Sequence, residues 1–279
     1  MRPITVEIDG TVRRGRVVSL PPDVSPGTVL EAIRGGDTGR LTVDCEQPRP
    51  VHDHVGHIHG GMGIRTRTAL ARAARSRDLT TEYDAEIERL DAEIAACEAE
   101  LADHESGDCT PSRRSLAEQG TGTELREAVA AARGRLRACR DHGTDTDDAV
   151  ERLEAAISEL AEQETSAAAA RERLAQARER NRRRREIRDR RLRLEDRRAN
   201  LEREARATLV DRLRDEFAAA VDAVPGTPTP AEPFDAADLP AALAVGHVAA
   251  LAAPVVLDCE LFDSPQTASE WLGAPIVNV

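Results

Sequence analysis

An arginine-rich stretch, RERNRRRREIRDRRLR, occupies residues 178–193 of this 279-residue chain and holds ten arginines and three acidic residues. Guanidinium groups form paired hydrogen bonds with phosphate and carboxylate oxygens. A row of exposed arginines on one long helix can therefore follow the phosphates of a nucleic acid. The candidate nucleic-acid-binding residues are Arg178, Arg180, Arg182, Arg183, Arg184, Arg185, Arg188, Arg190 and Arg191.

The same arginines could instead pair with acidic residues of this chain or of a partner protein. Residues 82–103 contain nine acidic residues and one arginine. If the chain pairs antiparallel outward from its two ends, Leu101 lies opposite about Asn200. The acidic residues then face about 198–219, and the arginine block faces the weakly charged residues 105–122. Both readings stay open, together with a simple solvated face.

Four histidines lie within nine residues, in the sequence VHDHVGHIH at 51–59. Imidazole is a good ligand for zinc or nickel. On one straight strand, His52 and His54 would face one side and His57 and His59 the other. Metal binding would therefore require a turn at Gly56; the alternative is a histidine-rich strand without metal.

The elements that must position these residues are predicted by composition and periodicity. Aromatic residues make up 2% of the chain, and its abundance of Ala, Arg, Glu and Leu is typical of long helices. From residue 80 the apolar residues are spaced as in a coiled coil. Thr81 and Asp84 form a plausible capping pair at the start of this region. The residues of this seam include Tyr83, Ile87, Leu90, Ile94, Cys97 and Leu101.

The pattern predicts an antiparallel coiled-coil hairpin over residues 80–221. Glycines and a proline predict a break at 105–122, and DHGTDTDD predicts a tip near 141–148. One helix is then expected from about Asp148 to Val221. A proline-rich linker, 222–233, follows it.

The two ends of the chain, 1–79 and 234–279, are predicted to form one small α/β head. Strands are expected at Ile4–Ile8, Val12–Leu20, Leu41–Cys45, Val55–His59, Pro254–Asp258 and Pro275–Val279. Helices are expected at Ser25–Arg34, Ile64–Arg77, Leu239–Leu251 and Ser264–Leu272. The fold class is therefore α+β, with a head built from both ends and a long helical arm.

This order of head, arm, tip, arm and head resembles the layout of SMC/Rad50-like proteins. The segment ALAVGHVAALAAPVVLD, with Asp258 at its end, resembles the Walker B region of such ATPases. The family places Glu directly after this Asp, whereas here Cys259 follows and Glu260 comes next. GGMGIRT at 60–66 resembles a phosphate loop, but the loop requires a lysine, and the chain contains none. The resemblance implies a degenerate nucleotide-binding head without ATPase activity.

All 39 basic residues are arginine, and 51 residues are acidic, which gives a formal net charge of −12. Such a composition suits molar salt, where acidic self-repulsion is screened. The chain also resembles an uncharacterised haloarchaeal coiled-coil family, on the stretches GMGIRTRTALARAARSR, APVVLDC and ASEWLGAPIV. We expect a cytoplasmic, non-enzymatic protein with no membrane partner. Its expected partners are a protein, a second copy, or nucleic acid on the chromosome.

Overall fold

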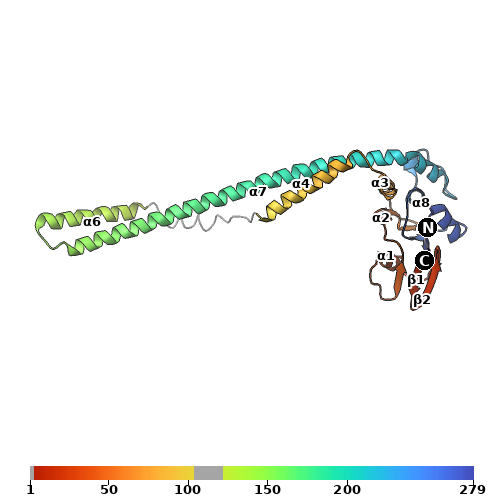
Figure 1. The fold of residues 1–279 in the computed structure, drawn as a ribbon, viewed down its shortest axis with the longest axis horizontal. Helices are drawn as coiled ribbons and strands as arrows, with labels where there is room; N and C mark the ends of the chain where they lie inside the picture. Colours follow the sequence, from red (N-terminus) through yellow and green to blue (C-terminus); the bar gives the residue numbers. More distant parts are fainter. Residues whose placement is uncertain (1–2, 104–121) are drawn as a thin grey trace. The chain divides into compact units, whose positions relative to one another are not determined.

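A computed structural model describes residues 3–103 and 122–279, and its fold is α+β (Figure 1). The chain divides into two compact units. The head unit consists of Met1–Glu88 and Arg198–Val279, and the arm unit consists of Arg89–Arg197. Two of the long helices, α4 (Asp84–Asp103) and α7 (Asp147–Asp222), contribute residues to both units.

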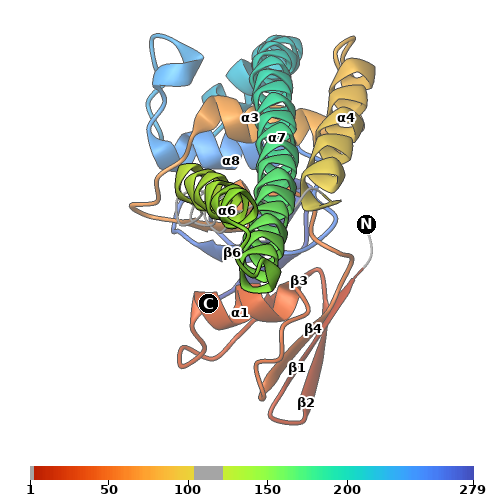
Figure 2. The same cartoon turned by 90° about the vertical axis from the view of Figure 1, so that its left-hand side faces the viewer.

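The head contains a small antiparallel sheet with strand order β2-β1-β4 (Figure 2). Its strands are β1 (Ile4–Ile8), β2 (Thr11–Gly15) and β4 (Leu41–Asp44). Asp9 and Gly10 both have positive φ, as a two-residue hairpin turn requires. Alternate residues of β1 are buried, and helix α1 (Pro26–Ile33) packs with them in one core cluster.

The second sheet of the head is parallel and joins the two ends of the chain. Its strand order is β3-β7-β6-β5. Strands β3 (Val17–Ser19) and β5 (His57–His59) precede the long helices, whereas β6 (Val255–Asp258) and β7 (Ile276–Asn278) follow them.

Two strand predictions are wrong in this region. The strand expected at Val12–Leu20 is divided into β2 and β3, which belong to different sheets. The strand expected at Val55–His59 begins only at His57, because the preceding residues form helix α2 (His52–Val55). A three-residue parallel strand is too short to produce a recognisable alternation of polar and apolar residues.

The larger core of the head lies among α3 (Thr66–Ser76), α8 (Asp238–Val248), α9 (Pro265–Leu272) and the end of α7. A short 3₁₀ helix, Pro233–Asp235, places Phe234 against this core. The α7 residues buried in this core are Leu209, Val210, Leu213, Phe217, Ala220 and Val221. The last part of α7 is therefore a core helix of the head.

The arm unit is helical and contains α6 (Thr123–His142) and most of α4 and α7. Helix α6 ends at His142 and is capped by Gly143, which has a φ of 67°, and α7 begins at Asp147. A turn thus lies within the tip region expected at 141–148, and the single long helix expected from Asp148 to Val221 is confirmed. Of the break expected at 105–122, only Gly122 lies within the described residues.

Candidate functional site

The arginine block lies within α7, and part of it is paired with acidic residues of α4. Arg183 Nη2 lies 3.4 Å from Glu100 Oε1, and Arg190 Nη2 lies 3.4 Å from Glu93 Oε2. From the first pair to the second, the residue number rises by seven on α7 and falls by seven on α4. A third contact joins Arg191 Nη1 to Glu98 at 3.7 Å. The α4 residues 93–100 therefore lie antiparallel beside the arginine block.

This register differs from the one expected from the sequence, which placed Leu101 opposite Asn200 and the block opposite 105–122. Two features of the head explain the difference. The end of α7 is buried in the head core, so that Arg212 rather than Val221 lies beside Thr80, donating to its carbonyl oxygen at 2.7 Å. Residues 79–81 lie outside helices and turns, and extended chain advances about 3.3 Å per residue instead of about 1.5 Å.

Two arginines of the block lie at interior positions of the helix. Arg184 and Arg191 are partly buried, on the same face as the buried Ile187. The side chain of Arg191 is 33% exposed, and it also pairs with Glu195 at 3.3 Å. Long arginine side chains can cover apolar neighbours with their methylene groups while the guanidinium stays near water.

The remaining members of the candidate set divide in two. Arg182 is exposed and pairs with Glu186 on the same helix at 3.0 Å. Four other arginines are exposed and form no hydrogen bond or ion pair with any other residue in 3–103 or 122–279. These are Arg178, Arg180, Arg185 and Arg188. The arginine block thus contains arginines that pair with carboxylates and exposed arginines with no described partner. Arg182, Arg183 and Arg190 of the first group are exposed as well.

The four histidines of 51–59 are not brought together as one ligand set. His52 is 6% exposed, and its Nε2 and Nδ1 lie 3.0 Å and 3.3 Å from the carbonyl oxygens of Ala253 and Arg49. The rings of His57 and His59 are 4.4 Å apart, and burial lowers the pKa of His57 and of His54. Within the described residues, no group of three or more His, Cys, Asp or Glu side chains is placed to hold a metal ion.

The two segments that resemble nucleotide-binding motifs are neighbours in the parallel sheet. His59 at the end of β5 is paired with Asp258 at the end of β6. Glycines 60, 61 and 63 follow β5 and lead into α3, whose first turn has neither an acidic residue nor a side-chain cap. Glu260 lies two residues beyond β6, outside regular structure. Ligands of parallel sheets commonly bind at this edge.

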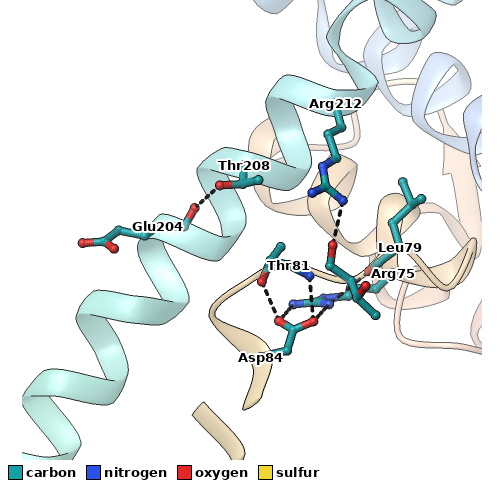
Figure 3. Close-up of polar contacts among 8 residues, drawn as sticks. Arg75, Leu79, Thr81, Asp84, Glu204, Thr208 and Arg212 are labelled. Atoms are coloured by element: carbon teal, nitrogen blue, oxygen red, sulfur yellow. Dashed lines mark hydrogen bonds and ion pairs between the residues drawn. The ribbon is translucent and has the colours of Figure 1, made fainter. Parts of the chain in front are cut away.

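The connection between α3 and α4 is held by a polar cluster (Figure 3). Asp84 accepts hydrogen bonds from both terminal nitrogens of Arg75, at 2.6 and 2.5 Å, and from the backbone N–H and hydroxyl of Thr81, at 2.9 and 2.6 Å. The arginine and the Thr81 bonds hold the pKa of the Asp84 carboxyl well below its usual range. Thr81 and Asp84 are in contact as predicted, but not as a helix cap, because the Thr81 hydroxyl donates to Asp84 and α4 begins at Asp84 itself. Arg75 was missed, because only the fold brings the end of α3 to the start of α4.

A family model described as a family of unknown function, DUF7856, matches residues 15–276. The chain belongs to this family. The match spans the long helices and most of both terminal segments, but it begins after β1 and leaves out nearly all of β2. No curated protein and no solved structure matched the chain. Among the described helices, none has a stretch long and apolar enough to cross a lipid bilayer.

Proposed function

We propose that this DUF7856 protein is a non-enzymatic interaction protein whose arm binds nucleic acid through the solvent-facing arginines of α7. The observation that carries the proposal is the division of the arginine block. Carboxylates satisfy Arg182, Arg183, Arg190 and Arg191, whereas Arg178, Arg180, Arg185 and Arg188 are exposed without a described partner. The guanidinium groups of these four exposed arginines have no carboxylate partner among the described residues, so they are available to bind an external anion.

We further propose that the arm is an antiparallel coiled coil, in the SMC-like arrangement that the element order resembles. Support comes from the seven-residue spacing of the ion pairs between α4 and α7. It also comes from buried small and aliphatic residues at heptad-like spacing, a pattern typical of helices that pack along a seam. These residues are Leu90, Cys97, Val129, Ala132, Leu136, Ala170, Leu174, Ala177 and Ile187.

The proposed setting is the cytoplasm of a haloarchaeon, with chromosomal nucleic acid as the partner. The lysine-free composition and the formal net charge of −12 support a high-salt environment. Binding through phosphates weakens steeply as salt rises. Several arginines acting together along one helix are then needed, and the four exposed side chains span residues 178–188 of α7.

A second candidate function is a nucleotide-binding head that lacks ATPase activity. The pairing of His59 with Asp258 supports it, because it places the glycine-rich turn and the Walker-B-like strand at the same sheet edge. The chain has no lysine to contact the β- and γ-phosphates. Thermal stabilisation by ATP with magnesium would support this candidate, and it should be lost in an Asp258→Asn variant.

The arm proposal is tested with two variants that remove the same number of charges from the same helix. The exposed-set variant replaces Arg178, Arg180, Arg185 and Arg188 by Gln. The paired-set variant replaces Arg182, Arg183, Arg190 and Arg191 by Gln. Binding of labelled duplex DNA and RNA is measured by fluorescence anisotropy from low to molar KCl, and circular dichroism checks helix content.

We expect the exposed-set variant to bind nucleic acid more weakly, with the slope of log K against log salt reduced by about 3 to 4 if each arginine contacts one phosphate. The paired-set variant should keep its affinity, and its thermal stability should fall only slightly, because exposed ion pairs contribute about 0–1 kcal/mol each. An equal loss of affinity in both variants would refute the division of the block. Absence of nucleic-acid binding by the unaltered chain would refute the proposal itself.

A further inference from the structure

Four of the eight residues that line a groove of about 540 Å³ on the head are arginines. Arg67 comes from the first turn of α3, and Arg203, Arg206 and Arg214 come from α7. Asp211 is the one carboxylate of the lining, and the other lining residues are Ala207, Thr208 and Val210. In a chain of formal net charge −12, this groove is a local concentration of positive charge.

None of these four guanidinium groups forms an ion pair with another residue of the described ranges. Arg67 and Arg214 instead lie over the ring of Phe234, with 4.2 and 5.7 Å from the guanidinium carbon to the ring centroid. Arg203 donates to the Asn200 side chain and, at 3.4 Å, to the Ala199 carbonyl oxygen. Arg206 forms no hydrogen bond with any other described residue.

Other arginines of the head are satisfied differently. Arg40 pairs with Asp9 and Asp23, Arg75 pairs with Asp84, and Arg77 pairs with Glu216. The arginines of the groove therefore differ from their neighbours by converging on one hollow while lacking carboxylate partners. Placing like charges together is unfavourable unless an anion compensates them.

We propose that this groove binds an anion carrying two or more phosphate groups. The planar guanidinium fork matches phosphate oxygens in paired hydrogen bonds. Arg203 and Arg214 are three helical turns apart, which is about 16 Å along the helix axis. One phosphate cannot reach all four arginines over that span, whereas a row of linked phosphates can.

The lining contains no aromatic side chain on which a base could stack. Phe234, which lies beneath the arginines, is already stacked with Phe217 at 5.4 Å between ring centroids. Recognition is therefore directed at phosphates and is independent of base identity. The ligand is either a free polyphosphate, such as the phosphate tail of a nucleotide, or the backbone of a single-stranded nucleic acid.

This site is independent of the proposed arm function, because its residues belong to the head unit and are absent from the 178–191 set. The test uses the full chain and inorganic tripolyphosphate, titrated by isothermal calorimetry at low salt. The groove variant carries Arg203→Gln and Arg206→Gln, which leaves the two arginines over Phe234 in place. The matched control carries Arg133→Gln and Arg137→Gln, two exposed arginines of α6.

We expect saturable binding of tripolyphosphate by the unaltered chain and by the control, and at least tenfold weaker binding by the groove variant. Both variants should keep the circular dichroism spectrum and urea midpoint of the unaltered chain. The inference is overturned if binding is not saturable, if the control weakens it equally, or if polyglutamate binds as tightly as tripolyphosphate.

A second titration identifies the source of the phosphates. Single-stranded oligothymidylate is added to a chain in which Arg178, Arg180, Arg185 and Arg188 are already replaced by Gln, with and without the groove substitutions. An affinity that falls with the groove substitutions assigns the groove to a nucleic-acid backbone. Oligothymidylate binding that is unchanged by them, together with tripolyphosphate binding that depends on them, assigns the groove to free polyphosphates.

Discussion

Replacement of Asp84 by Asn should destabilise the head far more than replacement of a comparable exposed aspartate. The Asp84 side chain is 24% exposed, and that of its partner Arg75 is 35% exposed. Asp84 accepts four hydrogen bonds from Arg75 and Thr81 (Figure 3). Each carboxylate oxygen accepts one bond from Arg75 and one from Thr81. The substitution removes the negative charge and turns an NH2 group toward one donor of each residue, so at least two of these bonds are lost.

Hydrogen bonds to charged groups are worth about 1.5–3 kcal/mol each, and the retained amide oxygen keeps part of the network. We therefore expect Asp84→Asn to lower the free energy of unfolding by about 2–4 kcal/mol. Asp53 provides a matched control in the same unit, because its only described ion pair, with Arg34, has 68% and 54% exposed side chains. Exposed pairs contribute about 0–1 kcal/mol, so Asp53→Asn should have little effect.

The acid dependence of stability gives a second test of the same reasoning. Arg75 and Thr81 lower the pKa of Asp84 in the folded state. A carboxyl whose pKa is lower in the folded than in the unfolded chain stabilises the fold at pH values above its unfolded pKa, which is about 3.9 for Asp. This stabilisation is lost as the pH falls toward the folded pKa. The stability difference between the unaltered chain and Asp84→Asn should therefore shrink below about pH 4.

Trp271 is the only tryptophan of the chain and lies in α9, so its fluorescence in urea reports unfolding of the head. The reasoning is refuted if Asp84→Asn costs no more than Asp53→Asn at neutral pH. It is also refuted if the difference between Asp84→Asn and the unaltered chain stays constant as the pH is lowered.

The same urea measurement checks two further substitutions in the head. Phe217 is fully buried, and its ring stacks with that of Phe234 at 5.4 Å between centroids. Phe217→Ala should therefore lower the free energy of unfolding by about 3–5 kcal/mol. A loss smaller than that of an exposed substitution would contradict the place of Phe217 in the core. A Cβ at Gly56 would lie 2.4 Å from the His52 carbonyl oxygen, so Gly56→Ala should destabilise the head by about 1–3 kcal/mol. Gly60→Ala is its control, because nothing lies within 4 Å of a Cβ there; equal effects of the two would contradict the close approach at α2.

The sequence predicts the helices well because their signals are local. Heptad spacing, Gly143 and the prolines after residue 222 locate α7 to within one residue at each end. The short strands β3 and β5 are harder to predict, since they have three residues each and pair with segments far away in the chain. Hydrophobic periodicity does not predict that Val12–Leu20 is divided between two sheets.

The candidate sites illustrate the same limit more sharply. The sequence identifies the arginine block but not which of its members are paired, because pairing depends on the register between α4 and α7. Register depends in turn on how much of α7 the head core buries, and that core includes α8 and α9 from the far end of the chain. The groove around Arg206 was missed for a similar reason, since Arg67 and Arg214 meet only across the contact of α3 with α7.

The register also decides how the arm should respond to salt. Residues 82–103 and 178–193 carry opposite charge in similar amounts, and the ion pairs between them lie at exposed positions where salt screens strongly. Rising salt should therefore weaken the pairing of α4 with α7 and any contact of the exposed arginines with phosphate at the same time. Removing charge from one set while leaving the other intact separates the two effects. In the high-salt setting proposed above, the arm would depend mainly on its buried apolar residues, and binding of a partner would depend on several simultaneous arginine contacts.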